Sequence, residues 1–460
     1  MVARLRLYLG IWAAKLSFLV LRALGRNGSQ VPGLVALKVC PSWLTDVTTP
    51  KRVIVVTGTN GKTTVANLLI DALAGEGIPT TNNRAGSNTD AGVVSALAVA
   101  MTWSGRPTTE VAVLEMDERS ALRILPGLRP EILVCTNLTR DSIKRNAHPE
   151  YIAWILSSGI SEDTTLVLNA DDLICAGVGS ATQGRRLFGV EQLPSDTTEP
   201  RGVALDLTVC PMCGTTLVWD FWRFNHIGHA HCPACGFAST PPEYAVTSVD
   251  YSHERITMNL RGRDLTCHLL NDNIVNIYNQ IAVCTTLDLV GIPLDRIGEA
   301  FDHLAAPATR YSAQQVGQVT LVRQLTKGLV GVACSRAFHY IMAAPGTKAL
   351  VMNIDEVTDA KDDCENTCWI YDADYEFLAD PSLKQVVVGG GRRYDQALRL
   401  AIAGVDPQII ETTPDERGAA EMINLDGIER VYNLHSVHNA ISTGNHVQTR
   451  LLARLGGGVE

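Results

Sequence analysis

Runs of apolar residues followed by polar loops recur along the first half of the chain. Residues 53–56 form a continuous β-branched run, typical of a buried parallel strand, and a helix is predicted after it over 65–73. The same order of apolar strand, polar loop and helix returns at 111–114, 132–135 and 166–168. Because strands that alternate with helices form parallel sheets, this region is predicted to be a doubly wound α/β domain.

Two polar breaks interrupt this pattern. The first break, at 194–201, precedes a segment rich in Cys, His, Trp and Gly that has no helical periodicity and is interpreted as a small inserted module. The α/β pattern resumes near Tyr244, with a helix predicted over 277–289, and the second break follows at 305–311.

A further α/β unit follows the second break. Strands are predicted at 349–352 and 385–388, and a helix at 394–403. The chain is therefore predicted to divide into an N-terminal segment 1–50, a domain 51–310, an insertion 203–242 within that domain, and a C-terminal domain 311–460.

The first 24 residues are apolar and basic, as in signal peptides and membrane anchors. Lys15 interrupts them, and the uninterrupted apolar stretches 7–14 and 16–21 are far shorter than the ~20 residues that a membrane-spanning helix needs. An amphipathic helix on the protein surface is predicted instead. It either packs on the protein or lies against the anionic inner leaflet of a membrane.

Composition and charge exclude two classes of protein. With 46% apolar and 19% charged residues among 460, the sequence is typical of a globular chain and not of a disordered one. The formal net charge of −9 argues against a nucleic-acid-binding protein, since neutralising phosphates requires clustered Lys and Arg. Four of the twelve cysteines form two Cys-x-x-Cys units, which indicates a metal site in a reducing cytoplasm.

A glycine-rich turn follows the 53–56 strand. The string Gly58-Thr59-Asn60-Gly61-Lys62-Thr63-Thr64 stands between this strand and the predicted helix. Backbone N–H groups in such a turn surround phosphates, and the helix N-terminus adds the positive end of its dipole. Lys62 is expected to neutralise the β- and γ-phosphates of a nucleotide, and the Thr63 hydroxyl to bind Mg²⁺.

An acid that could hold the metal follows the strand at 111–114. Glu115 comes directly after this strand, and the carboxyl ends of parallel strands meet at the edge of the sheet where ligands bind. A Mg²⁺ role for Glu115 is therefore predicted. Asp117 and Glu118 are close enough to compete for the role, and a solvated acidic loop is the alternative.

The inserted module carries two matching knuckles. Cys210-Pro-Met-Cys213 and Cys232-Pro-Ala-Cys235 are each followed by Gly and are separated by a spacer of 18 residues. Four thiolates at this spacing close a tetrahedral Zn²⁺ site, which leaves no coordination position for a catalytic water. The zinc is therefore predicted to be structural, and His226, His229 and His231 between the knuckles are interpreted as surface or packing residues.

These motifs together resemble the Mur ligase family. The match extends from the glycine-rich turn and Glu115 to the strings Thr136-Asn137-Leu138-Thr139-Arg140-Asp141 and Leu168-Asn169-Ala170-Asp171-Asp172, to Asn276-x-x-Asn279 and to Arg310. A four-cysteine ribbon inserted in the ATPase domain resembles one branch of that family, the MurT subunits of lipid II isoglutaminyl synthase. Similar segments are Val113-Leu114-Glu115-Met116-Asp117-Glu118, the stretch 369–376 and Gly389-Gly390-Gly391-Arg392.

The resemblance implies a fold, a set of cofactors and a reaction. The fold is a Mur-ligase-like P-loop ATPase domain with an inserted zinc ribbon, followed by a C-terminal Rossmann-like α/β domain. The cofactors are ATP, Mg²⁺ and structural Zn²⁺. The reaction is the ATP-dependent amidation of the D-glutamate α-carboxylate of lipid II to D-isoglutamine through an acyl phosphate, in peptidoglycan synthesis on the cytoplasmic side of the membrane.

The resemblance also assigns residues and a partner. Lys62 and Glu115 are implied in catalysis, and the nucleotide is assigned to Gly58, Thr59, Asn60, Gly61, Lys62, Thr63, Thr64, Asn169, Asp171, Asn276, Asn279 and Arg310. Ammonia comes from a separate class-I glutaminase, GatD, which docks on the C-terminal domain and supplies Cys and His. An Asp of the present chain would orient that His as the third member of a triad. Asp362 is the nearest match, with Asp355, Asp359 and Asp363 as alternatives.

Several positions depart from the family pattern and keep two other functions open. Ala360 replaces a Gly of the acidic segment, Ser142 and Lys144 stand in the string after Asp141, and Ile274 replaces a Gly before Asn276. The first alternative is a self-sufficient Mur-type or folate-type ligase that joins an amino acid to a carboxylate. The second is a zinc-bearing assembly subunit whose ATP site has lost turnover.

Overall fold

The computed structural model describes residues 2–141, 148–180, 183–304, 311–326, 328–354, 367–436 and 443–456. These residues form two compact units, each built around one large β-sheet. The first unit takes its residues from Met1–Thr139, His148–Glu199 and Leu207–Ala306. The second takes its residues from Arg140–Ala147, Pro200–Asp206 and Pro307–Glu460, so two short pieces of the first half of the chain belong to the C-terminal unit.

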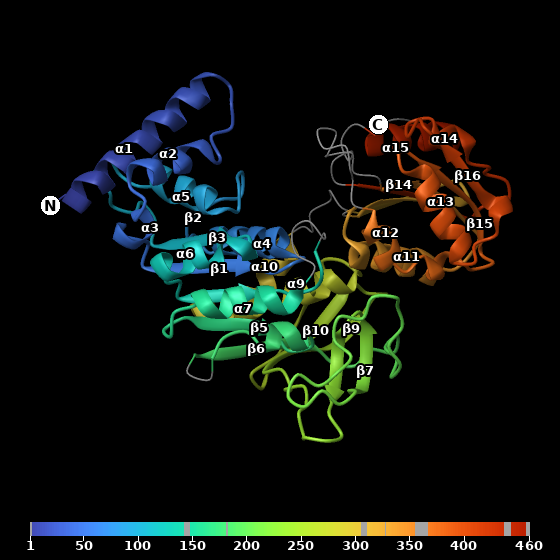
Figure 1. Cartoon of the computed structure of the whole chain (residues 1–460), viewed down its shortest axis with the longest axis horizontal. Helices are drawn as coiled ribbons and strands as arrows, with labels where there is room; N and C mark the ends of the chain where they lie inside the picture. The colour runs from blue at the N-terminus through green and yellow to red at the C-terminus, as the bar shows by residue number, and fades with distance from the viewer. Residues whose placement is uncertain are drawn as a thin grey trace. The chain divides into compact units, whose positions relative to one another are not determined.

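The sheet of the first unit has nine strands among the described residues, in the order β11-β10-β9-β6-β5-β4-β1-β3-β2 (Figure 1). Their bounds are β1 (Arg52–Thr57), β2 (Thr80–Asn82), β3 (Val111–Glu115), β4 (Ile132–Cys135), β5 (Thr165–Asn169), β6 (Arg185–Val190), β9 (Tyr244–Asp250), β10 (Arg255–Leu260) and β11 (Arg263–His268). All pairs from β2 to β9 are parallel, and β10 is antiparallel to both of its neighbours.

Both faces of this sheet are buried, which explains the continuous apolar strand sequences. In β1, Ile54 and Val56 belong to one core, whereas Val53 and Val55 belong to another. Alternate side chains of a strand point to opposite faces, so each core lies on its own side of the sheet. The first core is closed by α4 (Lys62–Gly75), α9 (Ile274–Val290) and α10 (Leu294–His303).

The opposite face carries more helices. The second core takes residues from α1 (Val2–Ala23), α2 (Val31–Val39), α3 (Trp43–Asp46), α5 (Asp90–Val99), α6 (Ala121–Leu128), α7 (Pro149–Gly159) and α8 (Leu173–Ala176), and the short 3-10 helix η1 (Glu118–Ser120) precedes α6. The surface helix expected in the first 24 residues is α1. Ile11 and Ala14 on one side of α1 are fully buried, so this helix packs on the protein.

The strands expected from the first half of the sequence are confirmed as β1, β3, β4 and β5, and the helix expected at 65–73 begins earlier, at Lys62. The segment after Tyr244 differs from the expected order of strand and helix, because β9, β10 and β11 form an antiparallel meander before α9. The local sequence explains it: Ile256, Met258 and Leu260 are buried on alternate positions of β10. Such a period of two is typical of an antiparallel strand with one polar face.

The inserted segment forms a hairpin between the two knuckles. Strands β7 (Val218–Phe224) and β8 (Ile227–His231) pair antiparallel, and Asn225 takes a positive φ of 49° in the turn between them. Apolar side chains anchor the hairpin, since Phe221 and Trp222 are buried and Ile227 belongs to the first core. The ribbon is therefore integrated into the first unit and is not an appendage.

The described part of the second unit contains a six-stranded sheet of order β12-β13-β17-β14-β15-β16. Its strands are β12 (Tyr311–Val316), β13 (Val319–Leu325), β14 (Lys348–Asn353), β15 (Leu383–Gly389), β16 (Ile410–Thr413) and β17 (Arg430–His435). Its helices are α11 (Gly331–Ala343), α12 (Cys368–Asp372), α13 (Arg393–Ile402), α14 (Ala419–Met422) and α15 (Asn445–Arg454), with the 3-10 turns η2 (Tyr375–Leu378) and η3 (Pro407–Ile409). The strands expected at 349–352 and 385–388 and the helix at 394–403 are confirmed as β14, β15 and α13.

Candidate functional site

The loop between β1 and α4 has a backbone that only glycine can adopt at two points. Gly58 has a φ of +121° and Gly61 a φ of +91°. A Cβ on Gly58 would collide with the Thr136 hydroxyl, and a Cβ on Gly61 would collide with the Asn279 side chain. No side chain of the described residues caps α4, whose N-cap position is Gly61. The first N–H groups of the helix are therefore open to an anion.

Lys62 folds back over this loop. Its Nζ donates to the Gly58 carbonyl oxygen and, at 2.8 Å, to Glu118 Oε1. Burial lowers the pKa of Lys62, but the charges of Glu118, Glu115 and Asp117 outweigh this effect and raise it above its ordinary value. Lys62 therefore carries a full positive charge at neutral pH, held directly beside the open helix N-terminus.

A second loop braces the first. Asn137 exchanges two hydrogen bonds with the Asn60 backbone: the Asn60 N–H donates to Asn137 Oδ1 at 3.1 Å, and Asn137 Nδ2 donates to the Asn60 carbonyl at 2.8 Å. Thr59 and Thr139 are paired in the same way, since the Thr59 hydroxyl donates to the Thr139 carbonyl at 2.9 Å and accepts from the Thr139 N–H at 3.0 Å. The string from Thr136 to Thr139 thus fixes the glycine-rich loop.

Glu115 lies at the carboxyl end of β3, the strand beside β1, and is held by two asparagines. Asn83 bonds both backbone groups of Glu115, and Asn88 Nδ2 donates to Glu115 Oε1 at 2.9 Å. The chain places Thr63 on the exposed side of the first turn of α4 and buries Thr64. Among the three competing acids, Glu118 is the one that pairs with Lys62, which leaves Glu115 available for another cation.

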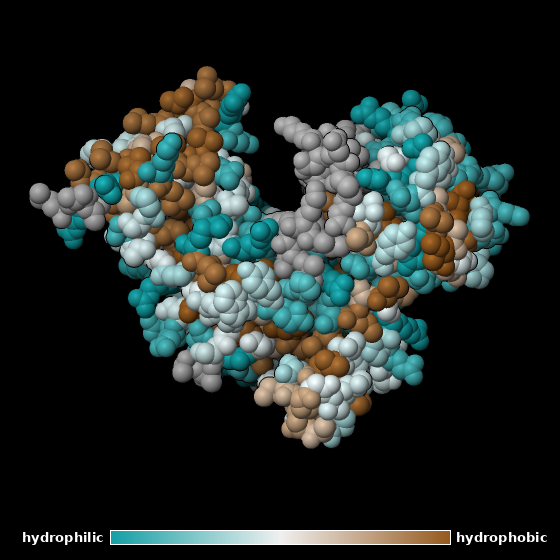
Figure 2. All heavy atoms as spheres, viewed as in Figure 1, coloured by the Kyte–Doolittle hydropathy of each residue, from teal (hydrophilic) through white to brown (hydrophobic). Residues whose placement is uncertain are grey.

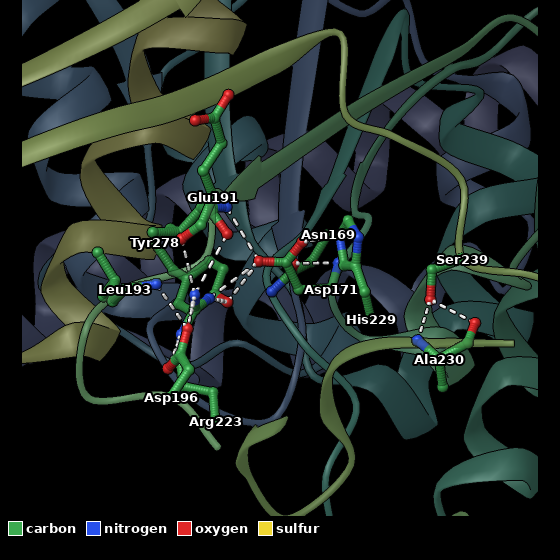
Figure 3. A network of polar contacts seen from close by, with 11 residues as sticks. Asn169, Asp171, Glu191, Leu193, Asp196, Arg223, His229, Ala230, Ser239 and Tyr278 are labelled. Carbon is green, nitrogen blue, oxygen red and sulfur yellow. Dashed lines mark hydrogen bonds and ion pairs between the residues drawn. The ribbon is translucent and has the colours of Figure 1, made fainter. Parts of the chain in front are cut away.

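Asn169 and Asp171 lie deeper than the loop, at the end of β5. Asn169 Nδ2 donates to the Thr136 carbonyl at 3.1 Å, so it supports the bracing string. Asp171 is fully buried, and four groups donate to its carboxylate: the Val190 N–H, the Tyr278 hydroxyl, Arg223 and His229 (Figure 3). With its oxygens engaged in this way, Asp171 joins β5 to the ribbon hairpin and to α9.

Arg223 is the buried centre of that network (Figure 3). It forms a two-point ion pair with Asp196, at 3.0 and 2.7 Å, and contacts Asp171 at 3.1 Å. Burial lowers the pKa of Arg223, but Tyr278, Asp171 and Asp196 raise it well above its ordinary range. The guanidinium is therefore permanently charged and compensated by two buried carboxylates.

The neighbouring Asp172 connects the ribbon turn to the bracing string. One of its oxygens accepts from the Leu138 N–H at 2.6 Å, and the other lies 3.0 Å from Nε2 of His226 in the ribbon. On the other side, Tyr278 is adjacent to Asn279, which contacts the glycine-rich loop at Gly61 and bonds Asn276 at 3.3 Å. Sequence reasoning missed the roles of Arg223 and Tyr278, because nothing in the local sequence marks them. His226 is fully buried, which agrees with its interpretation as a packing residue.

The four cysteines of the ribbon converge as predicted from their spacing. The sulfurs of Cys210, Cys213, Cys232 and Cys235 all lie within 4.8 Å of one another, with 3.5 Å between Cys210 and Cys235 and between Cys213 and Cys232. The two knuckles have the same geometry: Gly214 and Gly236 both have a φ of +75°, and the backbone N–H groups of Cys210 and Cys232 donate at 2.7 Å to residues five positions on. His226, His229 and His231 are bonded to aspartates outside this cluster.

The chain was compared with known proteins. The model of the Mur ligase middle domain matches residues 56–192, and the model of the MurT ligase C-terminal domain matches residues 330–437. The MurT subunit of lipid II isoglutaminyl synthase from Staphylococcus aureus strain COL is 29% identical over 92% of this chain and 94% of that protein. The corresponding subunit of Streptococcus pneumoniae is 26% identical over 94% of each chain.

The chain is a MurT-type member of the Mur ligase family. Solved structures show the same fold at lower identity. A pseudomurein peptide ligase type C from Methanothermus fervidus aligns with a TM-score of 0.68 and 17% identity, over 89% of this chain and 81% of that one. MurF from Thermotoga maritima in complex with ADP aligns with a TM-score of 0.59 and 14% identity, over 92% and 84%.

Membership of the Mur ligase family implies ATP and Mg²⁺, and the residues of this MurT-type chain fit both. The glycine-rich loop, the uncapped helix N-terminus and the charged Lys62 match a polyphosphate. An exposed hydroxyl at Thr63 and a carboxylate at Glu115 are oxygen ligands of the kind that Mg²⁺ prefers. Arg310, Asp355, Asp359, Asp362 and Asp363 lie outside the described residues.

Proposed function

We propose that the chain is the synthetase subunit that amidates the D-glutamate α-carboxylate of lipid II to D-isoglutamine, at the expense of ATP. The observation that carries the proposal is the match over 92% of the chain, including a MurT-type C-terminal region, to subunits with that activity in their name. The proposed division is an ATP-binding domain at 51–310, a ribbon at 203–242 and a partner-binding domain at 311–460, after an N-terminal segment at 1–50.

Lys62 and the glycine-rich loop would bind the phosphates and keep the transferring group in place. A fixed cation beside the γ-phosphate stabilises the charge that spreads over its oxygens when it passes to the substrate carboxylate. Because Lys62 is already held by Gly58 and Glu118, it needs little reorganisation for this task. Ammonia would then displace phosphate from the acyl phosphate to give the amide.

Thr63 and Glu115 are the residues we assign to Mg²⁺, which when bound would neutralise phosphate charge. Asn88 orients the Glu115 carboxylate, and Asn83 fixes its backbone. The glycine-rich loop is supported by Asn279 with Asn276, and by Asn169 through Thr136. Asp171 is fully buried, so its contacts favour a positioning role and not direct contact with the nucleotide. Arg310 stays a predicted nucleotide contact.

We assign structural Zn²⁺ to the four-cysteine cluster. Four sulfurs of two knuckles fill a tetrahedral coordination sphere, so no position remains for a reacting water. Hydrogen bonds between Cys213 and its neighbours Thr215 and Cys232 lower the pKa of the Cys213 thiol to about 6, which favours the thiolate that a metal binds. Metal analysis of the purified chain tests this assignment: about one zinc per chain is expected, and a fourfold Cys→Ser variant is expected to hold none.

The proposed partner is a class-I glutaminase of the GatD type that supplies ammonia. Asp362 stays our prediction for the residue that orients the partner's catalytic His, with Asp355, Asp359 and Asp363 as alternatives. Because the substrate is a lipid-linked precursor, we propose that the complex works on the cytoplasmic side of the membrane, at its inner face. No DNA or RNA is part of the proposal.

The test is reconstitution with a class-I glutaminase of the GatD type. The two chains should copurify, and glutamine with ATP should convert lipid II to its amidated form, detected by mass spectrometry of the muropeptide. Free ammonia should replace the glutaminase when the chain is assayed alone. No amidation under either condition, with ATP bound, would contradict the proposal and favour an assembly subunit without turnover.

A self-sufficient ligase that adds an amino acid is the second candidate. It is favoured by the likeness of the fold to MurF and by a match, 26% identical over 169 residues, to a UDP-N-acetylmuramoylalanine–D-glutamate ligase of Corynebacterium jeikeium. That match covers only 35% of the chain. Amino-acid-dependent phosphate release by the isolated chain, without glutamine or ammonia, would decide for this candidate.

A further inference from the structure

One face of α1 is apolar and uncovered by the described residues. The exposed positions are spaced by three, four or seven residues, which places them on one side of a helix. They are Leu5, Leu9, Trp12, Leu16, Leu19 and Val20, and we call them the α1 stripe. Their exposed fractions run from 42% for Trp12 to 58% for Leu5 and Val20.

This exposure is unusual because the opposite side of α1 already contains the residues that fix the helix to the protein. Ile11 and Ala14 are fully buried in the second core. A surface helix of a globular protein normally carries polar residues on its outer face. The α1 stripe lies on the side of the helix away from these anchoring residues, and a contiguous apolar surface of this kind marks an interaction site.

Two neighbouring elements enlarge the apolar surface. Val31 and Leu34 of α2, which packs along α1, are exposed, and Figure 2 shows the apolar residues gathered over these two helices. Trp103 is exposed by 51%, and its carbonyl accepts a hydrogen bond of 2.8 Å from the Trp12 indole. Two tryptophans with Tyr8 beside Trp12 give this surface the aromatic composition of a membrane–water interface.

The charge of this region has the opposite sign to the charge of the chain. Residues 1–45 contain six Lys or Arg and no Asp or Glu, whereas the whole chain has a formal net charge of −9. Arg4 and Arg22 lie 18 positions apart, about five helical turns, so both lie along the same border of the α1 stripe. A protein with a net negative charge approaches an anionic surface only through such a locally positive face.

We propose that the α1 stripe, with Val31, Leu34 and Trp103, docks into the interfacial region of an anionic phospholipid bilayer. The stripe runs about 22 Å along α1, and an apolar face bordered by arginines is the arrangement of helices that lie in the plane of a membrane. No described helix is long and apolar enough to cross the bilayer. The proposal rests on the proposed function only in that a lipid-linked substrate places the reaction at this surface.

The charge distribution favours lipid over a second copy of the chain. If two α1 stripes faced each other, the arginines along their borders would be brought together, and like charges across an interface repel. An anionic bilayer instead supplies both an apolar interior for the stripe and negative headgroups for the arginines. Each basic residue at such a surface contributes roughly five-fold to the partition coefficient.

The first experiment measures binding of the full chain to sedimenting vesicles. Vesicles of phosphatidylcholine with about one third phosphatidylglycerol should bind the chain, and vesicles of phosphatidylcholine alone should bind it at least about ten-fold more weakly. Leu9→Gln with Leu16→Gln should lower binding by about ten-fold. Tyr151→Gln with Trp154→Gln, at positions on α7 that are at least as exposed, should leave it unchanged. Arg4→Glu with Arg22→Glu should remove the preference for anionic vesicles.

The outcomes separate this proposal from the proposed function. If the Leu9/Leu16 variant binds vesicles as well as the wild-type chain does, the proposed docking surface is wrong. The same conclusion follows if binding by the wild-type chain does not depend on phosphatidylglycerol. A wild-type dimer that this variant converts to a monomer, with vesicle binding unchanged, would assign the stripe to a second copy. Amidation of lipid II in detergent should survive the substitution while amidation in vesicles falls. If the wild-type chain amidates lipid II neither in detergent nor in vesicles, the result contradicts the proposed function but not the docking surface.

Discussion

The two sheets of the chain both place polar residues at the carboxyl ends of their parallel strands, but they use them differently. In the first unit these ends carry charge: Lys62 follows β1, and Glu115 closes β3. In the second unit the described ends of two neighbouring strands carry neutral groups: Asn353 closes β14 and His435 closes β17, paired across the sheet. Both of the latter side chains are fully buried.

The two edges differ in whether a charged side chain has a partner of opposite charge. In the first unit two cations at or behind this edge have carboxylate partners: Lys62 meets Glu118, and Arg223 meets Asp171 and Asp196. In the second unit, burial and the nearby Arg323 hold His435 neutral, and its Nε2 accepts a hydrogen bond of 2.9 Å from that arginine. The first edge is therefore suited to bind a polyanion, whereas the described residues of the second edge are suited to pack.

The largest effect is expected at the charged edge, from Lys62→Ala. Removing the cation that would stabilise the transferring phosphoryl group should lower kcat/KM for ATP-dependent amidation by about 10³-fold or more. Steady-state phosphate release, with circular dichroism to check the fold, measures it. Lys51→Ala is the matched control, because Lys51 pairs with Glu110 on the surface and its loss should leave the rate within two-fold. Normal activity of the Lys62 variant would remove the loop from the mechanism.

A second test removes the buried arginine that neutralises two carboxylates behind that edge. Arg223→Met leaves Asp171 and Asp196 buried without their cation, which typically costs about 3–5 kcal/mol. The free energy of unfolding in urea should fall by that amount. Arg255→Met, which breaks an exposed ion pair with Asp302, should cost less than about 1 kcal/mol. Similar losses for both variants would mean that the network of Figure 3 contributes no more than a surface pair.

The neutral edge should show a dependence on pH. Burial, together with Arg323, lowers the pKa of His435 to about 4 from an ordinary value near 6.5. The unfolded chain therefore binds a proton in a range where the folded chain does not. Stability from this residue is full above pH ~6.5 and is lost as the pH falls toward ~4, by about 3 kcal/mol in total.

Thermal unfolding of the full chain between pH 7 and pH 5 measures this loss. His435→Gln should flatten the dependence, whereas His253→Gln, an exposed histidine in the first unit, should not. A wild-type profile that stays level over this range would mean that His435 is not held neutral and that the two edges are less different than their geometry indicates.

How far each region could be predicted depends on the sequence distance over which it is assembled. The loop 58–64 was predictable because its strand, glycines, lysine and helix are consecutive, and the four cysteines because two short knuckles carry their own turns. The network around Asp171 was not, since Arg223 and Tyr278 are 52 and 107 positions away and each is an ordinary residue in its own strand or helix. Only the packing of β5, the ribbon and α9 brings them together.

The smallest predicted effect concerns a residue that sequence reasoning also missed. Asn88 donates to Glu115 Oε1 at 2.9 Å and thereby orients the carboxylate that we assign to Mg²⁺. Asn88→Ala removes one hydrogen bond of about 1 kcal/mol, so the Mg²⁺ concentration for half-maximal activity should rise by about five-fold while kcat at saturating Mg²⁺ changes little. Asn82→Ala, at the end of β2, is the control, because the Asn82 side chain bonds to Thr80 and to the Arg84 N–H. The assignment is wrong if the Mg²⁺ concentration for half-maximal activity rises equally in both variants, or if Asn88→Ala lowers kcat and added Mg²⁺ does not restore it. Asn88 would then stabilise the loop without orienting Glu115 for Mg²⁺.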